Sequence, residues 1–138
     1  GLCAGWNDVG NEGGVLLLAQ MSSRGNLLGL EGYTDSMVSA GIANSGVFGF
    51  IGNGSRADEL AELRMMVGDR KLIWTPGVNL AVGDGEMGQR YGHPRDAILA
   101  GSDGIIVGSG IYKSETPGDV AEAYAKLSWD ALLERGGE

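Results

Sequence analysis

The chain has 138 residues, 43% of them hydrophobic, which is enough for one compact domain with a buried core but short of the roughly 250 residues of a complete (β/α)8 barrel. Ten Lys and Arg residues against eighteen Asp and Glu give a net charge of -8, and the basic residues are scattered along the chain, which disfavours nucleic-acid binding. The single Cys3 cannot form an internal disulfide, no Cys/His cluster has metal-ligand spacing, and no apolar run approaches the ~20 residues of a membrane span, so we expect a cytoplasmic protein without a metal site.

The first predicted elements are two apolar strands with a helix between them. Residues 15–20 (VLLLAQ) form a continuous apolar run, which is typical of a strand buried on both faces in a parallel sheet. Thr34 can cap a helix that extends to about Asn44, and residues 47–52 (VFGFIG) are the next strand. Residues 1–14 lack the charged start and apolar core of a signal peptide, and we interpret them as the remnant of a preceding helix or loop.

The next unit pairs a helix with a third strand. Ser55 to Asp58 has the spacing of a capping box, with Asp in place of the usual Glu or Gln, and it predicts a helix that ends at Gly68. Residues 72–77 (LIWTPG) form the third strand. A long loop rich in glycine and aspartate follows this strand and reaches Tyr91.

The last unit contains two helices and a strand. Pro94 at a first-turn position and Gly101 bracket a short helix over residues 96–100, and residues 104–108 (GIIVG) are the fourth strand. Thr116 and Pro117 then open a final helix that ends at Gly136, with its apolar residues on one face. The final apolar face is formed by Val120, Tyr124, Leu127 and Ala131.

Residues 15–135 therefore contain four alternating βα units, which predict a single α/β domain over residues 1–138 with a parallel sheet and right-handed crossovers. The sequence MSSRGNL follows the first strand in place of the GxGxxG fingerprint, so a dinucleotide cofactor site is disfavoured. From the residues alone, a small doubly wound sheet and half of a (β/α)8 barrel both fit this pattern.

Polar side chains follow the carboxyl end of each predicted strand, which is where binding and catalytic groups of such folds lie. These candidates are Gln20, Ser22, Ser23, Asn53, Ser55, Thr75, Gln89, Tyr91 and Ser109. They can donate hydrogen bonds to a phosphate or an amide, but none is an obvious general base. His93, the only histidine, has no evident partner and is read as a helix-start residue, and Asp84 and Glu86 lie in a loop without apolar residues to raise a carboxyl pKa.

Two consecutive units near the C-terminus each consist of a strand followed by a glycine-rich loop. In (β/α)8 barrels the loops after the seventh and eighth strands commonly build a phosphate pocket. Gly108-Ser109-Gly110 either presents backbone N–H groups to an anion or forms an ordinary tight turn, and the glycines alone do not separate these readings. The pattern nevertheless points to a phosphorylated ligand.

The segments LLLAQMSSRGNL, LIWTPGVNL, MGQRY, SDGIIVGSGIY and KLSWDALLER occur in this order, and through them the chain resembles orotidine 5'-monophosphate decarboxylase. The resemblance extends from Val15 to Arg135 and implies the C-terminal half of a TIM (β/α)8 barrel. It also implies a role in pyrimidine biosynthesis, where the family converts orotidine 5'-monophosphate (OMP) to uridine 5'-monophosphate (UMP) and CO2 without a cofactor.

The resemblance assigns binding roles to several residues. It implies that Ser22 contacts the pyrimidine amide, that Gln89 bridges base and phosphate, and that Tyr91 holds the phosphate from a closing loop. Pro76, within residues 75–78, would form the base of that loop.

Two departures from the family pattern argue against catalysis by this chain alone. The resemblance implies that the Gly108 N–H takes a phosphate oxygen, but Ser109 stands where the family has a phosphate-clamping arginine. The family's Asp-x-Lys-x-x-Asp motif is absent, and the three lysines, Lys71, Lys113 and Lys126, lie outside such a motif. We therefore expect binding residues without catalytic ones.

A four-unit half-barrel has two open sheet edges, so we expect a partner: a second copy of the chain or a complementary N-terminal half-barrel. The expected function is that of the C-terminal half of an OMP decarboxylase, inactive alone, that binds OMP or UMP. The alternative is a non-catalytic fragment or assembly module that binds a sugar phosphate weakly or not at all.

Overall fold

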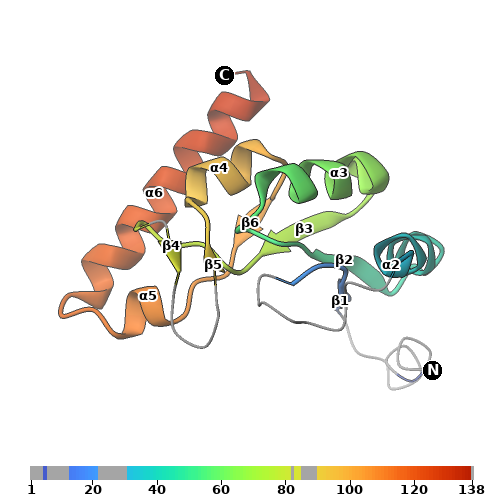
Figure 1. Cartoon of the computed structure of the whole chain (residues 1–138), viewed down its shortest axis with the longest axis horizontal. Coiled ribbons are helices and arrows are strands. Elements are labelled where there is room, and N and C mark those ends of the chain that lie inside the picture. Colours follow the sequence, from blue (N-terminus) through green and yellow to red (C-terminus); the bar gives the residue numbers. More distant parts are fainter. Residues whose placement is uncertain (1–4, 6–12, 22–30, 82, 85–89, 138) are drawn as a thin grey trace.

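The structure is a computed structural model that describes residues 5, 13–21, 31–81, 83–84 and 90–137 (Figure 1). Four parallel strands form one sheet in chain order: β1 (Val15–Leu18), β2 (Val47–Ile51), β3 (Leu72–Thr75) and β6 (Gly104–Ile105). A separate antiparallel pair consists of β4 (Gly83–Asp84) and β5 (Arg90–Tyr91). The helices are α2 (Tyr33–Ile42), α3 (Ala57–Val67) with the 3-10 turn η2 (Gly68–Arg70), α4 (Pro94–Leu99), α5 (Ser109–Tyr112) and α6 (Pro117–Gly136).

The strand order confirms the predicted parallel sheet of βα units. Each strand of this sheet pairs in parallel with the next strand of the sheet, and the order β1-β2-β3-β6 never reverses. A doubly wound sheet would need a reversal of strand order at a switch point. Among the described strands the arrangement is therefore that of consecutive barrel units and excludes the doubly wound alternative.

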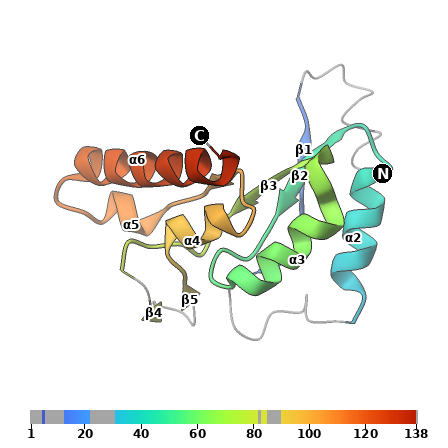
Figure 2. The ribbon, with the colours of Figure 1, turned by 90° about the horizontal axis from the view of Figure 1, so that it is seen from above.

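The hydrophobic core lies between one face of the sheet and the helices. Leu17, Phe50 and Ile73 occupy one register row across β1, β2 and β3 and pack in this core, Phe50 and Ile73 with 0% exposure. Leu60 and Leu63 of α3 complete it from the helix side, also fully buried. Figure 2 shows α2, α3 and α4 in a row along this side of the strands, with α6 alongside α4.

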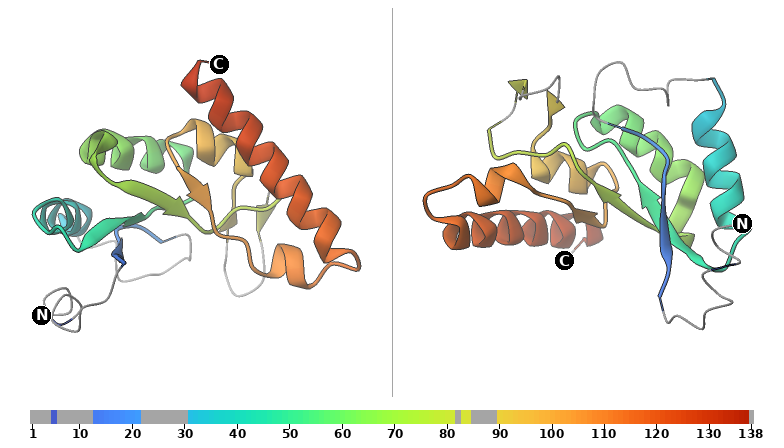
Figure 3. Two further views of the ribbon diagram at one scale, coloured as in Figure 1. Left: turned by 180° about the vertical axis from the view of Figure 1, so that it is seen from behind. Right: turned by 90° about the horizontal axis from the view of Figure 1, so that it is seen from below.

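The opposite face of the sheet has no helix over it in the described part of the chain, and we call it the open face. It consists of the alternate strand residues Leu16, Leu18, Ile51, Leu72 and Trp74, together with Ile106 directly after β6. All of these except the half-buried Ile51 are 37% to 46% exposed. No helix lies in front of β1, β2 and β3 in the right-hand view of Figure 3. In a complete barrel, side chains at such positions fill the interior in layers.

Several predicted helix ends agree with the structure. Gly68 follows α3 with φ +60°, a backbone conformation that residues other than glycine rarely adopt. Pro94 is the first residue of α4, and Gly101 follows that helix with φ +120°. Tyr124 and Ala131 of α6 are buried, as the apolar face of the last helix predicted.

Two predicted caps are wrong. Gly32, with φ +77°, precedes α2, and the Thr34 hydroxyl donates to the carbonyl of Ala19 (3.0 Å) instead of capping the helix. The capping box at the start of α3 does not form, because the Ser55 hydroxyl and backbone N–H both donate to the side chain of Asn53 (2.7 and 3.1 Å). In both cases the local spacing assigned the hydroxyl group to the start of the helix. In the structure the hydroxyl bonds instead to a residue at or just after the end of a strand.

Candidate functional site

The carboxyl ends of β1 and β2 are tied together by polar side chains that the sequence marked as candidates. The Gln20 side chain donates to the carbonyl of Glu59 (2.8 Å) and accepts from the N–H of Asn53 (3.0 Å). The Asn53 amide donates to the carboxylate of Glu59 (2.9 Å), and Asn53 is only 5% exposed. These groups therefore hold one end of the sheet together, and their polar atoms already have protein partners.

The loop after β3 closes on itself near its base. The Gly92 N–H donates to Gly77 and the Asn79 N–H donates to Gly92, both at 2.9 Å, while the short strands β4 and β5 pair beyond this point. A side chain on Gly92 would bring its Cβ to 2.3 Å from the carbonyl oxygen of Gly54, so the close approach of the two loops requires glycine there. The sequence predicted a long loop here, and the structure shows that it contains the short paired strands β4 and β5.

The predicted ligand residues that the structure describes lie at one edge of the sheet. Pro76 and Tyr91 belong to the loop after β3, and both are half-buried. Gly108 and Ser109 follow β6 at the same carboxyl edge. The Pro76 carbonyl accepts from the N–H of Gly54 (3.1 Å), so the loop base is also fastened to the neighbouring strand end. Ser22, Ser23 and Gln89 lie outside the described residues.

The segment after β6 begins a short helix, which the sequence did not predict. β6 ends at Ile105, earlier than predicted, and Gly108 is the N-cap of the short helix α5, which begins at Ser109. Ile111 and Tyr112 donate their N–H groups to the Gly108 carbonyl (2.9 and 3.2 Å). The segment therefore continues into a helix that has only four residues, one of them Gly110, and is too short to give a periodic signal in the sequence.

Thr75, one of the candidates, is enclosed within the fold. It is 0% exposed, and its hydroxyl lies 2.9 Å from the hydroxyl of Ser102, which in turn donates to the carbonyl of Gly104 (2.7 Å). Thr75 therefore stabilises the contact between β3 and the segment before β6. His93 is the N-cap of α4 and is half-buried, which confirms its reading as a helix-start residue.

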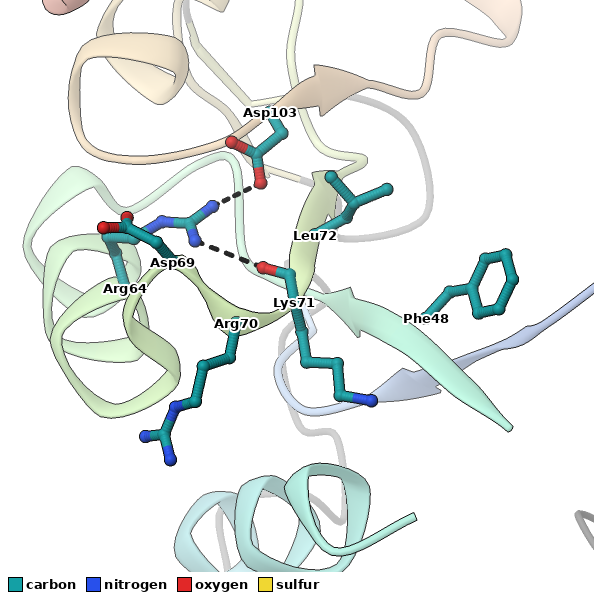
Figure 4. A pocket seen from close by; sticks show the side chains of 7 residues that line it. All are labelled: Phe48, Arg64, Asp69, Arg70, Lys71, Leu72 and Asp103. Carbon is teal, nitrogen blue, oxygen red and sulfur yellow. Dashed lines mark hydrogen bonds and ion pairs between the residues drawn. The ribbon is translucent and has the colours of Figure 1, made fainter. Parts of the chain in front are cut away.

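A hollow of about 260 Å³ opens at the other end of the sheet, where β3 and β6 begin (Figure 4). Arg64 and Lys71 are part of its wall, and both are bonded within the protein: Arg64 donates to the carbonyls of Gly68 (2.7 Å) and Gly101 (2.9 Å) and to Asp103. The Lys71 ammonium donates to two backbone carbonyls. This end of a barrel serves stability in known folds, so we do not assign a ligand to the hollow.

Neither a metal site nor a membrane span is found in the described ranges. No three His, Cys, Asp or Glu residues among them are grouped so that they could hold a metal ion. None of the helices described has the length and apolar character needed to cross a bilayer.

A sequence model of the orotidine 5'-phosphate decarboxylase / HUMPS family matches residues 4–124. The chain belongs to this family. Among curated relatives, the orotidine 5'-phosphate decarboxylase of Coccidioides immitis (strain RS) is 40% identical over 129 residues, which are 92% of this chain and 46% of the relative. The enzyme of Aspergillus oryzae (strain ATCC 42149 / RIB 40) is 35% identical over 129 residues, 93% of this chain and 47% of the relative.

Solved structures of the same family confirm the fold. Orotidine 5'-phosphate decarboxylase from Pyrococcus horikoshii OT3 superposes with a TM-score of 0.68 at 28% identity, covering 85% of this chain and 51% of that one. The enzyme from Sulfolobus solfataricus gives a TM-score of 0.69 at 24% identity, covering 95% and 55%, and supports the fold alone. The chain spans about half the length of these relatives, and its four βα units form half of a TIM barrel.

Proposed function

We propose that the chain is the C-terminal, nucleotide-recognising half of an OMP decarboxylase and contributes to UMP formation in pyrimidine biosynthesis. The observation that carries the proposal is the coverage: family similarity extends over 93% of this chain but only 47% of the Aspergillus oryzae relative. The four units would form one domain over residues 1–138. A cytoplasmic location accords with the single cysteine.

The ligand in this proposal is OMP or UMP, held by the loops at the carboxyl edge. Tyr91 and Pro76 on the loop after β3, and Gly108 after β6, would surround the phosphate, with Ser22 and Gln89 reaching the pyrimidine. Support comes from the common edge on which the three described residues lie. Backbone N–H groups and neutral donors suit a phosphate in a chain of net charge -8, because they bind an anion without a basic patch.

We also propose that this chain alone does not catalyse decarboxylation. No Asp-x-Lys-x-x-Asp motif occurs in the sequence. Lys71 donates to carbonyls at the opposite end of the sheet from the loops, and Lys126 pairs with Asp130 on α6. Lys113 is the C-cap of α5 and has its own interaction within the structure. Binding groups cannot replace a positioned proton donor and a charged neighbour of the substrate carboxylate.

A partner that covers the open face is part of the proposal. Leu16, Leu18, Leu72 and Trp74 present contiguous apolar surface, and β1 and β6 are the two edges of the sheet. Either a second copy or a complementary half-barrel would bury this face and pair both edges. The two kinds of partner give complexes of different composition. Sedimentation of the purified chain, with and without an added half-barrel, distinguishes them.

Calorimetric titration of the purified chain with UMP tests the nucleotide site. Ser109→Arg restores the family's phosphate clamp, and we expect it to tighten UMP binding by about 10- to 100-fold, the range of a charge-assisted contact. Ser45→Arg is the matched control, because it adds the same charge in an exposed position before β2 and should leave UMP affinity unchanged.

Two outcomes would contradict the proposal. Absence of UMP binding in both the wild-type chain and Ser109→Arg would favour the non-catalytic assembly module. OMP turnover that scales with the concentration of the purified chain, and that survives mock-purification controls, would overturn the predicted inactivity.

A further inference from the structure

The hydroxyl group of Tyr124 lies where α6 meets the loop after β3. Tyr124 is 3% exposed, and its hydroxyl oxygen accepts a hydrogen bond from the backbone N–H of Leu80 at 3.1 Å. The two residues are 44 positions apart in the sequence. A buried phenol that ends on a loop N–H fixes the position of that loop relative to the helix.

The same hydroxyl adjoins the segment after β6. A Cβ atom placed on Gly110 would lie 2.7 Å from the Tyr124 hydroxyl oxygen and 3.4 Å from the amide nitrogen of Asn79. Gly110 belongs to α5, which packs against α6, and Asn79 belongs to the loop after β3. Because Gly110 has no side chain, the Tyr124 hydroxyl has room to lie against both the segment after β6 and the loop after β3.

Backbone hydrogen bonds among the described residues also hold the loop after β3 to itself and to the neighbouring strand end. Gly77, Asn79 and Gly92 bond to one another, and Gly54 bonds to Pro76. The bond from Leu80 to Tyr124 is different because it leads to α6, the helix on which α5 rests. It thus links the two segments that carry the proposed phosphate contacts.

We propose that Tyr124 is a positioning residue that holds the loop after β3 and the segment after β6 at the separation a nucleotide phosphate requires. The inference rests on the proposed function, since it names the group that preorganises the same site. Tyr91 and Gly108 would contact the phosphate from opposite sides, so the affinity depends on their spacing being set before the ligand arrives. Tyr124 itself does not touch the ligand in this scheme.

Tyr124→Phe tests the proposal by removing only the hydroxyl group. We expect amide hydrogen exchange at Leu80 to become faster, together with that of residues 108–112, and UMP binding to weaken by about 3- to 10-fold, the size of one neutral hydrogen bond. Uridine, which lacks the phosphate, should bind with unchanged affinity. Tyr112→Phe is the matched control, because Tyr112 is 71% exposed and should change neither quantity.

Gly110→Ala tests the same contact from the other side. The added methyl group would displace the Tyr124 phenol, so the variant should reproduce the UMP defect, and the double variant with Tyr124→Phe should be no worse than either single one. Gly118→Ala is the control, because a Cβ there meets nothing within 4 Å.

Different results would overturn the positioning role of Tyr124 and the proposed nucleotide-binding function. Unchanged exchange at Leu80 in Tyr124→Phe, or equal losses of UMP and uridine affinity, would overturn the positioning role whatever the ligand. Coupled exchange changes in a chain that binds no UMP would instead overturn the proposed function, and with it the phosphate part of the inference.

Discussion

Arg64 and Asp103 form an ion pair that joins the end of α3 to the start of β6. The Asp103 carboxylate also accepts from the backbone N–H of Ile73 (2.8 Å) and from the guanidinium of Arg135 on α6 (3.0 Å). Arg64 and Asp103 are 20% and 24% exposed, so the pair is largely shielded from water. One carboxylate therefore connects α3, β3 and α6 at the end of the sheet opposite the loops that follow β3 and β6.

Asp103→Asn should lower the free energy of unfolding by about 1–3 kcal/mol, because it weakens charge-assisted bonds to two guanidinium groups and turns an amide N–H toward one of them. Urea denaturation monitored by circular dichroism measures the change. Asp130→Asn is the control: its pair with Lys126 is exposed on α6, and its loss should cost about 0.3–0.5 kcal/mol. Equal effects of the two substitutions would refute the assigned role of Asp103.

Thr75→Val should destabilise the chain by about 1 kcal/mol, because it removes the buried hydroxyl that bonds to Ser102 while keeping the side-chain shape. UMP affinity should not change, since the Thr75 side chain faces the helices. The double variant with Ser102→Ala should show coupling between the two sites. A loss of UMP binding with unchanged stability would instead place Thr75 in the ligand site.

Leu18→Lys should weaken association of the chain, because it introduces a charge on the apolar open face that a partner would cover. Analytical ultracentrifugation and binding of a dye for exposed apolar surface measure the effect. Met65→Lys on α3 is the control: Met65 is 76% exposed on the helix layer, and its replacement should leave association intact. A monomeric wild-type chain without dye binding would contradict the partner proposal.

The Asp58 carboxylate accepts two hydrogen bonds from the Arg56 guanidinium (3.1 and 2.8 Å), which, with the Glu59 backbone N–H, lower its pKa from 3.8 to about 2. A lowered pKa in the folded state adds stability that is present above pH 3.8 and is lost as the pH falls through about 2. Asp58→Asn should therefore lower the melting temperature near neutral pH and converge with the wild type near pH 2.

Arg56→Gln isolates the cause of this shift. NMR titration should show the pKa of Asp58 returning toward 3.8 in that variant, because the main hydrogen-bond donor is gone. The shift should also shrink in high salt, since both side chains are exposed. An unchanged pKa of Asp58 in Arg56→Gln would show that the guanidinium is not its cause.

The sequence by itself determined the four βα units, the helix ends at Gly68 and Pro94, and the family. These features depend on local information: the run of apolar residues in a strand, the backbone freedom of glycine and the fixed φ of proline. The common edge on which the described candidate residues lie was also predictable, because the carboxyl ends of parallel strands share one side of a sheet.

Only the tertiary structure decided how polar side chains are used. Thr34 and Ser55 had the spacing of helix caps, yet they bond to Ala19 and Asn53. Thr75 bonds to a residue 27 positions away, and Tyr124 reaches Leu80 across 44 positions. Such pairings depend on which face of a strand or helix meets another element, and no local pattern encodes the distance between residues that folding brings together.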